Sequence, residues 1–436
     1  MKFRLVELGA RVRDRTGVVF GSGFLPTRSA RWWGAILAVG VGGGLIGAAY
    51  VELMTLIGDV LGPGQFTDTE HLLVLVGVGA VIGALVLWLG ATGDVELLVD
   101  NIHVGRRRSD VRELRSLIPV SLLGIGAGSA IGPEAPLVQT TGTTAGFLAT
   151  RLGMEVDDAR VLTICGMAAG FTVLFGAPLG ATLFALEILH RRGLEYYEAL
   201  IPASVAALAG WVVYVGARAV GFAPVWHFPG VHSTDFGDLL LGVAAGVVAA
   251  VIAAGFAWWS RLSRAGFGRL PAWSRPALGG LALGALAFAS PYALTFGEGQ
   301  IQQVAITRIA VGTLLLGALV KFVAAGAIAS SGWRGGFIIP LFFIGAALGA
   351  AAWDVFGVHR VVIMVALMVA LNVGVTKTPF GSTLVVVEMA GLPVLAPALV
   401  AALASLFLTS RVGLIDSQRS RERVVRDRPD EPPPVV

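Results

Sequence analysis

A single carboxylate, Glu134, lies between two prolines in residues 128–137, which read Gly-Ser-Ala-Ile-Gly-Pro-Glu-Ala-Pro-Leu, with long apolar stretches on both sides. Burying a carboxylate at membrane depth is costly, so one that is retained there marks a path for ions or protons. Proline fits the first turn of a helix, where no N–H is needed, so Pro133 and Pro136 indicate a helix start. Because the start of a helix is positive, we expect a broken helix inside the membrane that handles an anion and carries Glu134.

Three glycine-rich breaks are candidate anion cradles, at residues 91–96, 128–136 and 331–340. Glycine lets the backbone approach an ion, and the helix that follows each break supplies free N–H groups. Backbone donors bind a halide without the full positive charge that would trap it, and conduction requires release as well as binding. Glycine clusters also serve tight helix packing, so the prediction depends mainly on Glu134 and on an internal repeat.

The repeat is the pattern Pro-x-Gly-x-Thr-Leu-x-x-x-Glu, which occurs at Pro178–Glu187 and again 201 residues later at Pro379–Glu388. An apolar segment opened by Pro-Leu lies upstream of each copy, at Pro136 and at Pro340. The sequence therefore predicts a duplicated transporter fold whose halves cover about residues 30–222 and 236–415. Such repeats place the substrate site at their interface, where the ends of broken helices meet.

Composition places these elements in a membrane. The 436 residues are 56% hydrophobic and 14% charged, with a mean hydropathy of +0.80, whereas soluble domains carry about 25% charged residues. Residues 72–90, 239–259 and 392–410 are uncharged and long enough to span the bilayer. Residues 337–353 and 361–376 are shorter or broken, which predicts tilted or re-entrant helices. A basic patch that binds nucleic acid is a poor alternative in such a chain.

Basic residues gather in the N-terminal segment up to Arg31, at residues 106–108 and 190–192, and from Arg411 onward, so these segments are expected in the cytoplasm. We expect residues 1–29 to be a cytoplasmic lead-in, residues 30–415 the membrane domain, and residues 416–436 a polar disordered tail. No appended soluble domain is expected. The protein is predicted to be a multi-pass protein of the plasma membrane with both termini in the cytoplasm.

Other chemistry finds little support in the sequence. The lone Cys165 lies in an apolar stretch, where it is expected to be a core residue, and the six histidines show no metal-ligand spacing. An enzyme in the membrane would need a nucleophile and base or a metal cluster, and neither His-x-x-x-His nor paired aspartates occur in the apolar segments. We therefore expect no enzyme activity, no metal and no cofactor.

These motifs resemble those of the CLC family of chloride channels and proton/chloride antiporters. Gly-Pro-Glu-Ala-Pro is similar to that family's Gly-Lys/Arg-Glu-Gly-Pro motif, and Gly335-Gly-Phe-Ile-Ile-Pro340 is similar to its Gly-x-Phe-x-Pro motif. The repeated Pro-to-Glu segments resemble its paired later helices. The resemblance implies an all-α inverted repeat of tilted and broken helices, a homodimer with one pore per subunit, and Glu134 as the gating glutamate.

The resemblance also implies where the anion binds. Phe337 and Ile338 would face the central ion through their N–H groups. Thr92 would take the role of the family's serine as a hydroxyl donor, although it serves equally well as a helix N-cap and Asp94 brings negative charge nearby. The implied anion-binding positions are Thr92, Gly93, Gly132, Ala135, Gly336, Phe337, Ile338 and Ile415.

Two departures from the family pattern affect the expected mechanism. In the family's antiporters an internal glutamate that relays protons follows the first-repeat glutamate, whereas Ile188 follows Glu187 here. Because Glu388 is the counterpart of Glu187 in the second repeat, we favour a shared structural role for both over a proton relay. Ile415 stands where the family has an anion-contacting tyrosine, which removes a donor.

Two cations, Arg334 and Lys377, stand near the predicted path. Either one could raise the local anion concentration, pair with an acid, or extend to the interface. The sequence therefore predicts passive, channel-like conduction of chloride or a similar small anion gated by Glu134. The alternative is a proton-coupled chloride antiporter with an inner proton route that is not recognised in the sequence.

Overall fold

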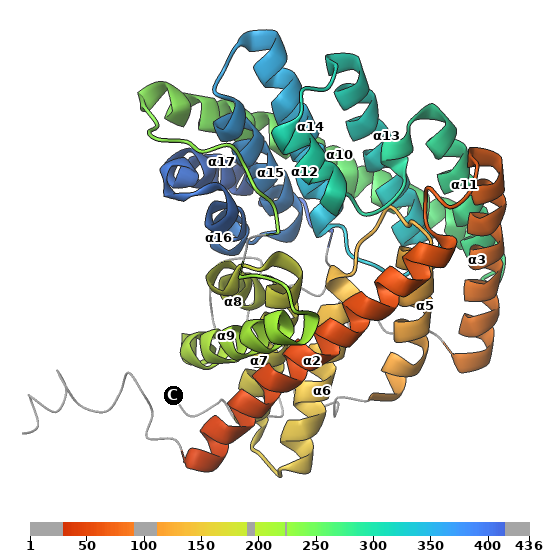
Figure 1. The fold of residues 1–436 in the computed structure, drawn as a ribbon, viewed down its shortest axis with the longest axis vertical. Coiled ribbons are helices and arrows are strands. Elements are labelled where there is room, and N and C mark those ends of the chain that lie inside the picture. The colour runs from red at the N-terminus through yellow and green to blue at the C-terminus, as the bar shows by residue number, and fades with distance from the viewer. Residues whose placement is uncertain (1–28, 91–110, 190–196, 223–224, 415–436) are drawn as a thin grey trace, which may run out of the picture.

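Helices make up nearly all of the secondary structure in the computed structural model, which describes residues 29–90, 111–189, 197–222 and 225–414 (Figure 1). Outside the helices of these segments, one isolated antiparallel β-bridge joins Gly132 to Gly336. The all-α fold expected from the sequence is confirmed. The predicted lead-in and tail lie outside the described residues, apart from Ser29.

The helices fall into two successive sets. The first set is α2 (Ala30–Leu61), α3 (Asp68–Leu89), the 3-10 helix η1 (Val111–Glu113), α5 (Leu114–Gly126), α6 (Glu134–Arg151), α7 (Val156–Phe175), α8 (Pro178–Glu187), η2 (Tyr197–Ala199) and α9 (Leu200–Arg218). The second set is α10 (Phe236–Gly268), α11 (Arg275–Ala289), η3 (Pro291–Ala293), α12 (Glu298–Ile306), α13 (Val311–Ser330), α14 (Ile338–Phe356), α15 (Arg360–Thr376), α16 (Pro379–Ala390), η4 (Leu392–Val394) and α17 (Leu395–Leu408).

The packing of the first set is repeated in the second. Helix α7 packs against α2, α6 and α9, and α15 packs in the same way against α10, α14 and α17. The long helices α2 and α10 also pack against α9 and α17, respectively. Two pairs of equivalent helices, α3 with α11 and α8 with α16, join the halves. The two halves therefore repeat one packing pattern, in agreement with the inverted repeat that the family resemblance implies.

Helices α8 and α16 cross closely because each has a glycine where the other approaches. A Cβ at Gly180 would overlap the backbone of Val385, and one at Gly381 would overlap the backbone of Phe184. Proline occupies the first position of both helices, where its missing N–H costs nothing. The repeated Pro-x-Gly pattern thus encodes the start of each helix and its contact with the other.

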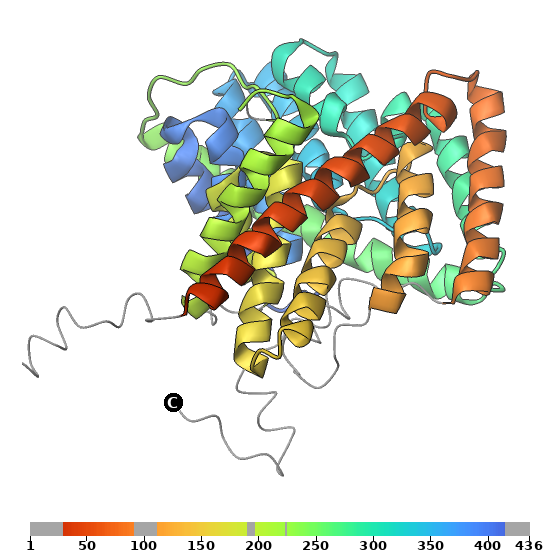
Figure 2. The ribbon, with the colours of Figure 1, turned by 60° about the horizontal axis from the view of Figure 1, so that its bottom comes forward.

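Seven of the described helices are long and apolar enough to cross a membrane, and α2 runs obliquely along the molecule (Figure 2). The expected spans at residues 72–90 and 239–259 lie in α3 and α10. The expectation of a full span at residues 392–410 is wrong. Residues Leu392–Val394, which include Pro393, form a separate 3-10 turn, and the α-helix that follows has 14 residues.

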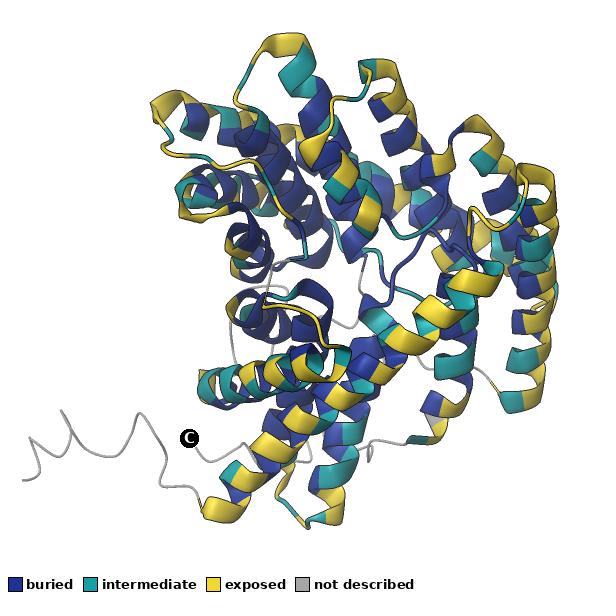
Figure 3. Cartoon of the chain, viewed as in Figure 1, coloured by how far each residue is buried: buried dark blue, intermediate teal, exposed yellow. Residues whose placement is uncertain are grey.

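Burial separates helices that face the surroundings from those that hold the core (Figure 3). Apolar side chains remain exposed along α2, α3 and α10, as expected where lipid is the solvent. Helices α7, α14 and α15 are mostly buried between other helices. Cys165 is fully buried in α7 and is a core residue, as predicted.

Candidate functional site

The Glu134 carboxyl group lies where the starts of two helices meet. Glu134 is the first residue of α6, its side chain is 0% exposed, and its Oε1 accepts a hydrogen bond of 2.5 Å from the backbone N–H of Ile339 in the first turn of α14. Both helix starts carry partial positive charge. The carboxylate therefore occupies a site that would suit a small anion. We call this site, at the starts of α6 and α14, the seat.

The other carboxylate oxygen has no partner in the seat. Among the described residues, Glu134 Oε2 has no hydrogen bond although it is buried. A buried polar atom without a partner costs about 1–3 kcal/mol, and more when it is charged. Protonation of the carboxyl group or movement of the side chain out of the seat would relieve that cost. The missing hydrogen bond to Oε2 therefore makes it easier for the Glu134 side chain to leave the seat.

The glycines of the isolated bridge make room for this carboxyl group. Gly132 and Gly336 donate to each other's carbonyl oxygens over 2.8 and 2.7 Å, which fixes the segment before α6 against the segment before α14. A Cβ at Gly132 would overlap Glu134 Oε2, and one at Gly336 would lie 2.8 Å from the same atom. The resemblance implies that both glycines are anion-binding positions, but here each N–H donates to the other glycine's carbonyl oxygen and the glycines contribute space.

Two cavities reach the residues on either side of Glu134 in the chain. The first, which we call the inner cavity, has a volume of about 160 Å³ and is lined by Ala135 and Pro136. The second, the outer cavity, has a volume of about 800 Å³ and is lined by Pro133. The residues that flank Glu134 in the chain therefore line two different cavities.

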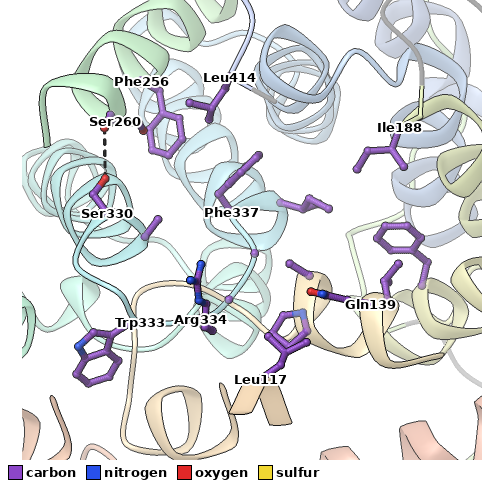
Figure 4. Close-up of a pocket in the computed structure, with 18 of the residues that line it drawn as sticks. Leu117, Gln139, Ile188, Phe256, Ser260, Ser330, Trp333, Arg334, Phe337 and Leu414 are labelled. Atoms are coloured by element: carbon purple, nitrogen blue, oxygen red, sulfur yellow. Dashed lines mark hydrogen bonds between the residues drawn. The ribbon is translucent and has the colours of Figure 1, made fainter. Parts of the chain in front are cut away.

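The inner cavity contains most of the predicted site that the structure describes (Figure 4). Phe337 and Ile338 line it, as do Arg334 and the fully buried helix residue Gln139. Ile188 also lines it, at the position where a proton-relaying glutamate was considered. The lining therefore combines an apolar wall with cationic and amide groups, which can hold an anion by weak contacts that also release it.

The two cations that the sequence singled out have different positions. Arg334 lines the inner cavity just before α14, where a positive charge would attract anions. Lys377 lines neither cavity, and its buried ammonium group donates to the carbonyl oxygens of Gly374 and Thr409 and to the Thr409 hydroxyl. A cation is stabilising at the C-terminal end of a helix, so Lys377 caps the ends of α15 and α17.

Glu187 and Glu388 cap helix starts in a reciprocal arrangement. Glu187, at the end of α8, accepts hydrogen bonds from the N–H groups of Phe380 (3.2 Å) and Gly381 (2.7 Å) at the start of α16. Glu388, near the end of α16, accepts one of 2.5 Å from Gly180 at the start of α8. Each carboxylate thus binds the positive end of the partner helix, which agrees with the shared structural role that the repeat indicated.

Sequence reasoning missed three residues of this region. Ile339 supplies the N–H bonded to Glu134, although the motif pointed to its neighbours Phe337 and Ile338. Lys321 of α13 is fully buried, and its ammonium group donates to the carbonyl oxygens of Leu294 and Thr295. Glu298 of α12 lines the outer cavity. A charged residue in a mostly apolar sequence could have drawn attention to Lys321 and Glu298. Their positions in the fold, however, depend on tertiary contacts that the sequence does not show.

Three predicted positions cannot be placed. Thr92 and Gly93 in the first glycine-rich break, and Ile415 after α17, lie outside the described residues. Their predicted contacts with an anion remain predictions.

Known proteins agree with this arrangement. A family model described as "Voltage gated chloride channel" matches residues 92–410. The chloride/fluoride channel protein of Pseudomonas syringae pv. tomato is 29% identical over 335 residues, which cover 74% of this chain and 72% of that protein. The putative chloride channel protein ClcB-like of Ralstonia nicotianae is 30% identical, over 69% of this chain and 72% of that one.

The fold is shared with two solved structures. A CLC-type fluoride/proton antiporter superimposes with a TM-score of 0.79 and 22% identity over 89% of this chain and 98% of that one. A slow cyanobacterial Cl⁻/H⁺ antiporter gives a TM-score of 0.76 and 20% identity over 88% and 95%. The duplicated helices, the carboxylate at the meeting of two helix starts, and the match of the family model over most of the chain lead to one conclusion: this is a multi-pass membrane protein of the voltage-gated chloride channel (CLC) family, whose members transport anions.

Proposed function

We propose that the protein conducts chloride or a similar small anion passively, and that Glu134 is the gate. The observation that carries the proposal is the bond of the Glu134 carboxylate to the Ile339 N–H, at a point where the flanking residues Pro133 and Ala135 line different cavities. A carboxylate and a halide have the same charge sign and seek the same helix ends. While Glu134 occupies the seat, it blocks an anion that approaches from either cavity.

The gate opens when the carboxyl group loses its charge or leaves the seat. A protonated carboxyl group is attracted less strongly by the two helix starts, so an anion competes with it more successfully. Acidification is therefore expected to increase anion flux through Glu134. Arg334 and Gln139 of the inner cavity would then hold the anion next to the seat.

The residues that line the inner cavity favour passive conduction over proton exchange. Ile188, which lines that cavity, cannot carry a proton, and Glu187 is engaged with the N–H groups of Phe380 and Gly381. The alternative, a proton-coupled antiporter, is supported by the names of two solved structures that share the fold, which are both antiporters. That alternative needs an inner proton route through other residues.

The orientation follows from the basic segments. The sequence before α2 and the segment between α8 and α9 carry positive charge and are assigned to the cytoplasm. The cavity lined by Ile188 and Leu414 then faces the cytoplasm, and the cavity lined by Arg218 at the end of α9 faces outward. We further propose a homodimer in the plasma membrane with one pore in each subunit.

Flux from liposomes tests the proposal. Purified protein is reconstituted, and chloride efflux and proton movement are recorded together from pH 5 to pH 8 for the unchanged chain, Glu134→Gln, Glu134→Ala and the control Glu155→Gln. Glu155 is exposed before α7 and its side chain makes no cap hydrogen bond there. We expect efflux without uphill proton transport, and loss of most of the pH dependence in both Glu134 variants only.

Two results would contradict the proposal. Proton uptake driven against its gradient by chloride would establish the antiporter instead. Identical pH profiles in the unchanged chain and both Glu134 variants would remove Glu134 from the gate.

A further inference from the structure

A second carboxylate, Glu298, stands in the outer cavity. It is the first residue of the short helix α12, after Gly297, which has a φ of 106°. The indole N–H of Trp226 donates to the backbone carbonyl oxygen of Glu298 over 3.1 Å, so the backbone is held in place. The side chain lines the cavity together with Pro133, the residue next to Glu134. The start of α12 is therefore fixed, and Glu298 shares the lining of the outer cavity with the residue that precedes Glu134.

No described residue bonds this carboxylate. Within the described part of the chain, neither a hydrogen bond nor an ion pair of the Glu298 side chain is found. The glutamines Gln300 and Gln303, which follow it on α12, share the cavity lining, but Gln300 donates its amide to the carbonyl oxygen of Leu294. The Glu298 carboxyl group therefore faces the cavity with the capacity to exchange a proton.

The cations of the surrounding helices have other partners. Arg218 of α9 lines the same cavity but forms an ion pair with Glu52 of α2. Lys321 of α13 donates to two backbone carbonyl oxygens. At the other end of α12, Arg308 pairs with Asp354 of α14, and Arg360 of α15 donates to the carbonyl oxygens of Val304 and Thr307. An ionised Glu298 thus adds negative charge to the cavity that these cations do not cancel.

A charge on Glu298 would also act on Glu134. Tyr214 of α9 lines the same cavity as Glu298, and Pro133, next to Glu134, does so too. Two carboxylates that interact oppose each other's ionisation. Helix α12 is not one of the spanning helices, and burial raises the pKa of Glu298 to about 7. Because this pKa lies above the ordinary value, the carboxyl group is protonated below about pH 7 and charged above it.

We propose that Glu298 is a proton-binding site of the outer cavity, whose charge controls the passage of anions to and from the seat of Glu134. The inference rests on the proposed anion flux. An ionised Glu298 repels an anion in the outer cavity, where the low-dielectric wall strengthens the repulsion, and a protonated Glu298 admits it. The site takes a proton from the solution that fills the outer cavity, and Glu134 responds to the charge of that site.

The test compares Glu298→Gln with the unchanged chain, Glu134→Gln, the double variant and the control Asp59→Asn, in liposomes with pH set separately on each side. Asp59 is an exposed residue near the C-terminal end of α2. Other residues of that part of α2 line the outer cavity, but Asp59 does not. At pH 8 and low ionic strength, Glu298→Gln is expected to raise efflux about tenfold and to flatten the response between pH 6 and pH 8.

Three further readouts separate a charge effect from a structural one. The increase in efflux of Glu298→Gln over the unchanged chain is expected to become smaller in 0.5 M potassium gluconate, because salt screens exposed charges. It should appear when pH is varied on the outer-cavity side only. The conservative variant Glu298→Asp should keep a pH response. If Glu298→Gln does not fold, which size-exclusion chromatography would reveal, loss of that response in Glu298→Asp would overturn the inference.

The failure of this inference is distinct from failure of the proposed function. If Glu298→Gln and the unchanged chain give superimposable pH profiles while Glu134→Gln loses its response, Glu298 is not the proton site and the gate stands. If neither variant changes the profile, both proposals fail. If the double variant shows the product of the two single effects, the charges act independently and the coupling to Glu134 is wrong.

Discussion

At the scale of single residues, the seat exists because two residues without side chains adjoin one that has a charged side chain. Gly132 and Gly336 pair through their backbones, and the space that their missing Cβ atoms leave is taken by the Glu134 carboxyl group. The sequence could predict that Glu134 is functional, because a carboxylate among apolar residues is conspicuous. It could not predict that the N–H groups of both glycines are already bonded.

The variant Gly132→Ala tests this arrangement. The new methyl group would overlap Glu134 Oε2, the far end of a flexible side chain, so the carboxyl group and not the backbone is expected to move. We expect higher chloride efflux at pH 8 and a weaker pH response, with a loss of stability of about 1–3 kcal/mol from overpacking. Efflux from liposomes and thermal unfolding in detergent measure the two effects.

Gly42→Ala is the matched control, because a Cβ at Gly42 in α2 would meet no atom within 4 Å. It should leave flux unchanged and be neutral or slightly stabilising, since alanine favours a helix over glycine. An unaltered pH profile in Gly132→Ala would show that the carboxyl group does not use this space.

At the scale of helices, reciprocal capping explains why one ten-residue pattern occurs twice. Proline begins each helix, glycine lets α8 and α16 cross, and the glutamate at the end of one bonds the start of the other. The repeat alone indicated a shared role for Glu187 and Glu388. Which atoms each carboxylate bonds required the structure, because the contact joins residues about two hundred positions apart.

The variants Glu187→Gln and Glu388→Gln are therefore expected to behave alike. Each weakens a charge-assisted hydrogen bond at a helix start, which should lower stability by about 1–3 kcal/mol. Thermal unfolding in detergent measures that loss, and Glu155→Gln is the control. Chloride efflux per folded protein should remain unchanged, with no proton movement in either variant. A change in proton movement that is confined to Glu187→Gln would instead make Glu187 a relay.

Helix boundaries were the weaker part of the sequence-based prediction. Hydropathy located the spans that lie in α3 and α10, but residues 392–410 are apolar throughout and still do not form one helix. Pro393 lies in the 3-10 turn before α17, and proline at that place starts a helix more readily than it continues one. Hydropathy records composition, whereas this boundary depends on backbone hydrogen bonding.

At the scale of the whole molecule, the duplication brings the starts of α6 and α14 to one point from two halves of the chain. Next to that point, Pro133 lines the outer cavity and Ala135 lines the inner cavity. The repeated motifs were sufficient to predict a duplicated fold and the meeting of helix ends, whereas the inversion was implied by the resemblance to the CLC family. The outer-cavity position of Glu298 was not predictable, because no local pattern places Glu298 of α12 in the same cavity lining as Pro133.

The central claim is that Glu134 occupies a site that an anion can take. Anomalous diffraction from crystals of Glu134→Ala and of the unchanged chain, both grown in bromide, tests it most directly. The variant should show a bromide within hydrogen-bonding distance of the Ile339 N–H, and the unchanged chain should show its carboxylate there and no bromide. Bromide peaks confined to the two cavities in Glu134→Ala, with the meeting point of α6 and α14 empty, would contradict the account.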